Sequence, residues 1–295
     1  MFTQIQENTI MLPDVLEIDM NNWSSAKPKG ISACIRIYND AEFVIPSTLS
    51  ILPYVNEVVF IYQPSSDYTL KKLKWLANRY PDKVKIEYYP ENVFWIDTDE
   101  FKSLPTTSIF HPVYMSNWGL SKCKYNWILK IESDVILSPS FGELRNNVLL
   151  GNQAQMKYVG FYIINLAGKD FDKFSVTHPR NHGTDEAIFN NNPYWNFIRL
   201  EKWEMINLEK GNWSCYGWGG YHLKRCKERY ITKPLNETLA TLSEETVREA
   251  MRHYHLTVNP YMGIDDSSGI PELWNIDTSN WRLDENDYSS ITRRQ

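Results

Sequence analysis

The chain has 295 residues, with 31 Lys and Arg against 36 Asp and Glu, a formal net charge of -5 and 42% hydrophobic residues. This length suits one large α/β unit or about two domains. The acidic balance and the scattered basic residues argue against a nucleic-acid partner, because phosphate backbones are bound by clustered Lys and Arg. No run approaches the roughly 18 apolar residues of a membrane helix, so we expect no integral membrane segment.

The start of the chain lacks the charged-then-apolar pattern of a signal peptide, and no two of the four cysteines form a CxxC pair. We therefore expect a soluble, cytoplasmic protein with reduced thiols, with peripheral association with a membrane as the alternative. The sequence gives no indication of oligomeric state. The 18 Tyr and 11 Trp against 12 Phe favour surfaces that bind something amphipathic such as a sugar, although an aromatic-rich core would give the same counts.

An irregular arm, 1–30, precedes a regular alternation of apolar runs and helical patterns. In chain order we expect strand 31–38, helix 42–52, strand 57–62, a helix capped by Asp67 and stopped by Pro81, strand 83–89, helix 113–122 and strand 127–131. Beyond these, the pattern predicts strands 156–166 and 195–206 and a helix starting at Ser243. Strands alternating with helices predict a mostly parallel sheet, whose ligands bind beyond the carboxyl ends of the strands.

Two carboxylates, Glu132 and Asp134, flank Ser133 directly after the apolar strand 127–131. At this end of a buried strand they would be costly to leave unpaired. Mg²⁺ or Mn²⁺ binds one or two carboxylates together with phosphate oxygens, which would let an acidic protein hold a diphosphate. The alternative is that both acids only cap the loop after the strand.

The context of this triplet resembles a known family. The run ISACIRIYND at 31–40, and the run from Asn117 through Gly119 and Cys123 into WILKIESD at 127–134, resemble the first strand and the Asp-x-Asp metal motif of family-2 glycosyltransferases. The chain departs from that pattern in having Glu132 as the first acid, and in ending the second strand with QPSSD at 63–67 instead of an early acidic pair.

The resemblance implies a GT-A fold, an α/β nucleotide-diphospho-sugar transferase architecture with a mixed, mostly parallel central sheet flanked by helices. It also implies a nucleotide-sugar donor, a Mn²⁺ or Mg²⁺ cofactor and inverting transfer to a hydroxyl of a sugar or glycan acceptor. We accordingly divide the chain into the arm 1–30, a nucleotide-sugar-binding half 31–136, an acceptor-binding half 137–260 of the same domain, and a covering segment 261–295.

Inverting transfer requires a base, and Asp185 and Glu186 in HGTDEAIFN are the candidates. We expect them at the positive N-terminus of a helix, with Asp185 slightly preferred, and helix capping alone as the alternative. The resemblance also implies a histidine late in the chain that contacts the metal or the diphosphate. His222 is the best-placed candidate, as a ligand of the metal with Glu132 and Asp134 or as a diphosphate contact, and it follows a run of glycines and aromatics that predicts a loop. A structural histidine is the alternative.

The remaining expected contacts are with the nucleotide and with the acceptor or sugar. The expected nucleotide-binding residues are Arg36, Tyr38, Asn39, Asp40, Asp67 and Ser133, with an internal acid as the alternative partner of Arg36. The expected acceptor or sugar contacts are Trp213, Trp218 and Tyr221. Two other functions compete with glycosyl transfer. The first is a nucleotidyltransferase, but the first strand is not followed by the Gly-rich basic loop that such enzymes normally have. The second is a non-catalytic carbohydrate-binding protein on a degenerate transferase scaffold.

Overall fold

A computed structural model of the protein describes residues 16–139, 141–149, 158–170, 173–179, 186–208 and 213–225. Its helices are α2 (Met20–Ser24), α3 (Val44–Ile51), α4 (Thr69–Arg79), α5 (Asp99–Ser103), α6 (Pro112–Ser121) and α7 (Phe141–Leu149). The expected helix from Ser243 and the segment 261–295 lie outside the described residues.

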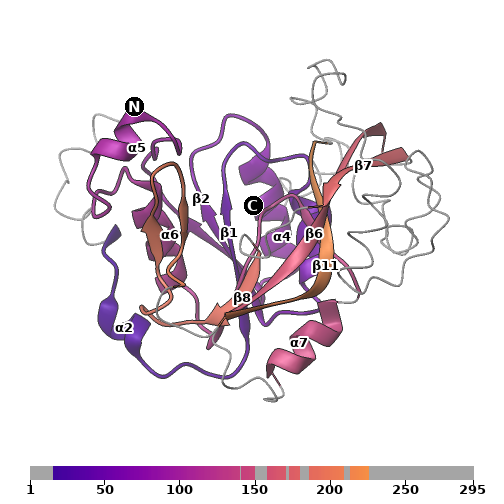
Figure 1. Ribbon diagram of the computed structural model, residues 1–295, viewed down its shortest axis with the longest axis horizontal. Helices are drawn as coiled ribbons and strands as arrows, with labels where there is room; N and C mark the ends of the chain where they lie inside the picture. The colour runs from indigo at the N-terminus through magenta and orange to yellow at the C-terminus, as the bar shows by residue number, and fades with distance from the viewer. Residues whose placement is uncertain are drawn as a thin grey trace.

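A nine-stranded mixed sheet forms the centre of the molecule (Figure 1). Its strands are β1 (Ile31–Ile37), β2 (Glu57–Tyr62), β3 (Val84–Tyr88), β4 (Trp127–Lys130), β5 (Val135–Leu137), β6 (Tyr158–Asp170), β7 (Lys173–Pro179), β8 (Ala187–Asn190) and β11 (Trp213–Arg225). The order is β3-β2-β1-β4-β8-β6-β11-β5, with β7 paired to β6. A separate antiparallel hairpin consists of β9 (Phe197–Arg199) and β10 (Glu204–Ile206).

The first four strands of this order, β3, β2, β1 and β4, are parallel, and α3, α4 and α6 connect them as predicted. β8 then runs antiparallel to both β4 and β6, while β11 runs parallel to β6 and antiparallel to β5. The expected mixed α/β sheet flanked by helices is therefore confirmed. All described strands but those of the hairpin join one sheet, so described strands from both expected halves, 31–136 and 137–260, share it. The expected boundary after 136 falls within β5.

Apolar residues on the two faces of β1 belong to two cores. Ile35 and its neighbours on the same face pack with α3, α4 and α7, whereas Cys34 faces the core that contains Trp118 of α6 and Trp23 of α2. The helices thus form a layer on each side of the sheet. This packing of both faces is what buried, near-continuous apolar strands such as β2 require.

Three predicted elements of the second half are wrong. Residues 187–190 form strand β8 and not the start of a helix, because this short apolar segment pairs with β4 on one side and β6 on the other. The segment 217–222 lies within strand β11 and is not a loop. The single strand expected over 195–206 is the β9–β10 hairpin. In the first half, the stretch 90–112 that was expected to be irregular contains the short helix α5.

Candidate active site

The loop between β4 and β5 carries the acidic triplet. β4 ends at Lys130 and β5 begins at Val135, so Glu132, Ser133 and Asp134 lie at the carboxyl end of β4, in the parallel half of the sheet. Asp134 is 3% exposed, whereas the side chain of Glu132 is 40% exposed. The loop therefore presents one buried and one accessible carboxylate at the edge where ligands of parallel sheets bind.

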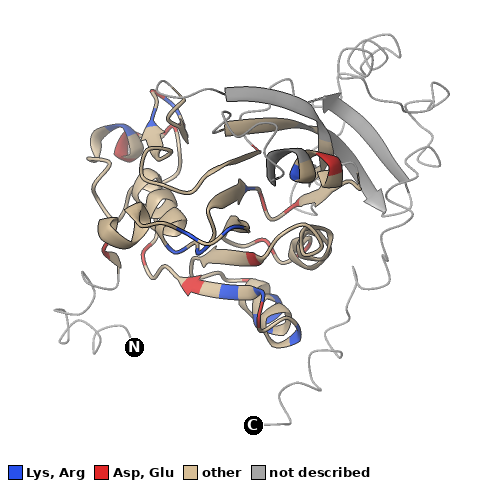
Figure 2. Ribbon diagram, turned by 90° about the horizontal axis from the view of Figure 1, so that it is seen from below, with Lys and Arg blue, Asp and Glu red and all other residues tan. Residues whose placement is uncertain are grey.

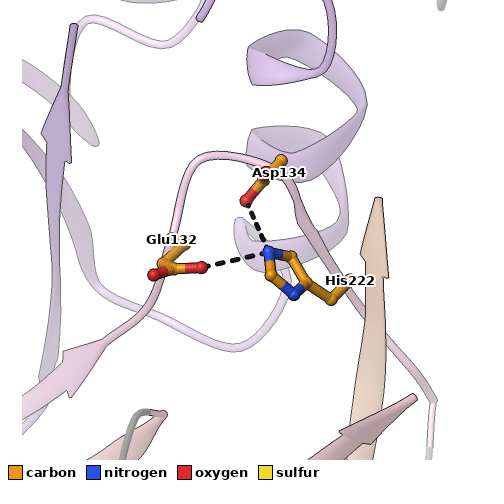
Figure 3. A group of neighbouring side chains, drawn as sticks. All are labelled: Glu132, Asp134 and His222. Atoms are coloured by element: carbon orange, nitrogen blue, oxygen red, sulfur yellow. Dashed lines mark ion pairs between the residues drawn. The ribbon is translucent and has the colours of Figure 1, made fainter. Parts of the chain in front are cut away.

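His222 reaches this loop from β11. β11 is antiparallel to β5 with His222 opposite Val135, and the amide of Leu223 donates to the carbonyl of Asp134 over 2.9 Å. The imidazole Nε2 of His222 lies 3.1 Å from Oε2 of Glu132 and 3.4 Å from Oδ1 of Asp134. Figure 3 shows both carboxylates directed toward the imidazole ring. The structure therefore brings together the three residues expected to bind the metal.

Two glycines allow β11 to approach so closely. A Cβ on Gly220 would lie 2.2 Å from the carbonyl oxygen of Ile136 in β5, and a Cβ on Gly219 would lie 2.3 Å from the ring of Phe161. The register of β11 against β6 shifts on both sides of Trp218, so bulges turn this part of the strand. The glycines that predicted a loop around a ligand instead allow a strand to pack against its neighbours.

The two carboxylates control the charge of His222. Burial disfavours the imidazolium, but hydrogen bonds and negative charge from Asp134 and Glu132 outweigh this effect and raise the pKa of His222 to about 9. A buried histidine with such a pKa is protonated at neutral pH. The site therefore stabilises a positive charge between the two carboxylates.

The donor atoms of these residues fit a divalent cation. One ligand atom from each of Glu132, Asp134 and His222 can be chosen so that all three lie within 4.8 Å of one another. Two carboxylate oxygens and one imidazole nitrogen suit Mn²⁺, and Mg²⁺ would use mainly the oxygens. The accessible side of Glu132 leaves room for ligands from a substrate.

Hydrogen bonds link the end of β1 to the acidic loop 132–134 and to the loop after β2. The hydroxyl of Ser133 donates a short hydrogen bond to Oδ2 of the buried Asp40. The amide of Asn39, at φ 48°, donates to Ser65 Oγ over 3.0 Å, and the amide of Asp40 donates to Thr69 Oγ1 over 2.8 Å. These bonds fix the expected nucleotide-binding residues Asn39, Asp40 and Ser133 beside one another.

Asp67 supports this loop structurally. Its Oδ2 accepts a hydrogen bond from the amide of Ala41 over 3.0 Å, and its Oδ1 accepts one from the amide of Thr69, the first residue of α4, over 2.9 Å. The N-cap residue of α4 is Tyr68 and not Asp67, so the capping prediction is wrong by one residue. The Asp67 carboxylate nevertheless binds the first amide of α4 and ties it to the loop after β1. A nucleotide contact by Asp67 stays a prediction.

Arg36 has an internal acidic partner. Its guanidinium forms an ion pair with Glu204 of β10 and donates to Ser116 Oγ of α6 over 2.8 Å, and it lies over the ring of Phe197. The arginine therefore attaches the β9–β10 hairpin to β1 and α6. The structure thus agrees with the alternative that Arg36 pairs with an internal acid. Glu204 lies 168 residues further along the chain, and no sequence pattern identifies it as the partner.

Of the two expected bases, Glu186 is described and Asp185 is not. Glu186 is 1% exposed and directly precedes β8, where Ala187 pairs with Lys130 of β4. This pairing places Glu186 beside the strand end that leads to Glu132. The expected helix N-terminus does not exist here, so any role of Glu186 depends on sheet pairing and not on a helix dipole.

The expected sugar contacts have different outcomes. Trp213 and Trp218 lie on β11, and their side chains are outside the described part of the structure. Tyr221 is 3% exposed, so its ring is packed within the protein and is not available for stacking. An exposed aromatic that the sequence did not single out, Trp95, lies instead beside Tyr38 at the end of β1. Its position in a long polar segment gave no periodic pattern from which to infer this contact.

Comparison with known proteins gives matches among solved structures. No protein-family model matches the sequence, and no curated protein matches it. The chain is similar to residues 1–349 of TarS from S. aureus, with 15% identity and a TM-score of 0.42, covering 65% of this chain and 60% of that one. It is also similar to 4-diphosphocytidyl-2C-methyl-D-erythritolsynthase from Anaerococcus prevotii, with 9% identity and a TM-score of 0.34, covering 55% of this chain and 72% of that one.

A further similar structure is that of glucosyl-3-phosphoglycerate synthase from Mycobacterium tuberculosis, in complex with Mn²⁺, UDP and glucosyl-3-phosphoglycerate. Identity is 16% and the TM-score is 0.31, covering 49% of this chain and 47% of that one. These are partial likenesses of fold, and function is therefore argued from the site itself. Within the described part of the chain, no helix has the length and apolarity to cross a membrane.

Proposed function

We propose that this protein is a metal-dependent, inverting glycosyltransferase that moves a sugar from a nucleotide-sugar donor to a hydroxyl of a sugar or glycan acceptor. The observation that supports this most strongly is the convergence of Glu132, Asp134 and His222 at the carboxyl end of the parallel strands. A site that already stabilises positive charge between two carboxylates suits a Mn²⁺ or Mg²⁺ ion that holds a diphosphate.

Different residues of the chain would bind the diphosphate and the nucleoside of the donor. Glu132, Asp134 and His222 would hold the cation, which when bound would neutralise negative charge on the leaving diphosphate. Asn39, Asp40 and Ser133, already fixed by hydrogen bonds, would orient the nucleoside. This arrangement orients the donor before the acceptor arrives, and such preorganisation lowers the cost of reaching the reactive geometry.

The acceptor hydroxyl requires a base on the side of the sugar opposite the diphosphate. We assign this role to the pair Asp185 and Glu186. In support, Glu186 directly precedes β8, and the pairing of Ala187 with Lys130 of β4 brings Glu186 close to the loop 132–134. Burial of Glu186 would keep bulk water away from the transferred proton. Attack from the face opposite the leaving group inverts the anomeric centre.

Calorimetry of nucleoside diphosphates with and without Mn²⁺ tests the proposal. We expect binding in the presence of Mn²⁺ and its loss in Asp134→Ala. A matched control exists in the same chain, because Asp97 and Asp99 also flank one residue, yet Asp97 pairs with Lys102 over 2.9 Å and Asp99 begins α5. The variant Asp99→Ala should bind as the wild type does. Absence of metal-dependent nucleotide binding in the wild type would refute the proposed function.

A further inference from the structure

An exposed tryptophan lies beside the residue that follows β1. Trp95 is 70% exposed, and its ring centroid lies 6.4 Å from that of Tyr38, with the two planes at 69°. Tyr38 is itself 40% exposed, and Phe94 and Ile96 are 38% and 48% exposed. A contiguous group of exposed large apolar side chains commonly marks a binding surface.

The turn that carries Trp95 is held in one conformation. The hydroxyl of Thr98 donates to the carbonyl of Trp95 over 2.8 Å and accepts from the amide of Phe101 over 3.1 Å. Asp97 adopts φ 65°, a left-handed conformation that is uncommon outside glycine. Such a conformation is retained where the surrounding contacts enforce it. The hydrogen bonds therefore fix the backbone that carries the exposed ring of Trp95, which lowers the backbone entropy lost when a ligand binds.

A short chain of contacts connects this aromatic pair to the candidate metal site. Tyr38 directly precedes Asn39 and Asp40, Asp40 accepts the hydrogen bond of Ser133, and Ser133 lies between the two metal-binding carboxylates. A nucleotide whose diphosphate lies at the metal and whose ribose lies near Asp40 would extend its base toward Tyr38 and Trp95. Close to Trp95 in the sequence, the carboxylate of Asp97 is paired with Lys102 and so offers no isolated negative charge to a nucleobase.

We propose that Trp95 stacks on the nucleobase of the donor and, together with Tyr38, forms the outer wall of the nucleotide site. This inference rests on the proposed function. The tilt of 69° between the two rings offers the face of one and the edge of the other to a single planar ligand. Trp95 would thus contribute to affinity for any nucleoside diphosphate while making no contact with the diphosphate itself.

The test compares UDP, ADP and inorganic pyrophosphate, each with Mn²⁺, by calorimetry and by tryptophan fluorescence. Trp95→Ala should weaken UDP and ADP binding by about 5- to 150-fold, the range seen when one base loses an aromatic stacking partner. Pyrophosphate binding should stay unchanged, and Trp95→Phe should restore most of the nucleotide affinity. The matched control is Trp203→Ala, an exposed tryptophan in the turn of the β9–β10 hairpin, which should bind all three ligands normally.

Each outcome separates this inference from the proposed function. If the wild type binds UDP with Mn²⁺ but Trp95→Ala binds it equally well, Trp95 does not stack on the base and only this inference fails. Equal weakening of pyrophosphate and UDP would also overturn it, because the effect would then not depend on the base. If the wild type binds no nucleoside diphosphate, both the inference and the proposed function fail. Thermal unfolding of the variants checks that each is folded, as expected for substitution of an exposed side chain.

Discussion

Substituting Gly220 by Ala should destabilise the protein and weaken metal binding together. The new Cβ would lie 2.2 Å from the carbonyl oxygen of Ile136, where ordinary contact begins at 3.4 Å, so β11 and β5 must separate by about 1 Å. The obstructing atoms belong to the backbone and cannot rotate away. Overpacking of this kind costs about 1–3 kcal/mol, equivalent to a fall of about 2–10 °C in the midpoint of thermal unfolding.

The same displacement would move His222, two residues further along β11, away from Glu132 and Asp134. Because metal sites tolerate errors of only about 0.2 Å in ligand distance, Mn²⁺ affinity should fall by at least about tenfold. Gly142→Ala is the matched control, since its Cβ would meet only a ring carbon of Tyr54 at 3.4 Å. Differential scanning calorimetry and Mn²⁺ titration measure both effects. A Gly220→Ala protein with wild-type stability and Mn²⁺ affinity would refute the reasoning.

Three further predictions concern the ionisable residues of the site. With a pKa of about 9, His222 is protonated at pH 7 and must lose its proton to bind a metal, so Mn²⁺ binding should release close to one proton. Calorimetry in buffers of different ionisation enthalpy measures this release, and finding none would contradict the prediction. Without metal, the raised pKa of His222 adds stability that is complete below roughly pH 6.5, the ordinary histidine value, and is lost as pH rises through about 9. Unfolding midpoints from pH 6 to 10 should show this decline, and His222→Gln should remove it. Glu186→Gln should lower turnover by about 100-fold or more while leaving UDP affinity intact; full turnover would move the base to Asp185 or away from this segment.

The parallel half of the sheet could be predicted from the sequence because each element there is long or sharply bounded. β2 has the six residues expected, β1 ends one residue before the predicted bound, and α6 is shifted by one residue at both ends. Their buried strands are continuous apolar runs, and turn residues separate them from the helices. Of these helices α4 has a clear apolar face, whereas α3 and α6 are buried on most sides. Local sequence therefore determines most of the architecture that leads to the loop at 132–134.

The second half could not be predicted in the same way, because pairing between distant segments determines its structure. The four residues of β8 are too few to distinguish a helix from a strand by periodicity, and Thr184, Asp185 and Glu186 before them resemble a helix start. Pairing with β4 and β6 decides in favour of a strand. At β11 the sequence predicts a loop where the structure has a strand, because the glycines that usually indicate a loop are required here for close strand packing.

The candidate metal site shows how these two kinds of information combine. Glu132 and Asp134 follow from local sequence, since any acid directly after β4 lies at the ligand-binding edge of the sheet. The position of His222 does not, because 87 residues separate it from Val135, the residue it faces. β5 begins immediately after Asp134, so the strand that pairs with β5 places its side chains beside the acidic loop. Gly220 allows β11 to take that position. The third ligand is therefore determined by which strand can approach β5 closely enough, and the structure of β11 is as necessary to the site as the acids themselves.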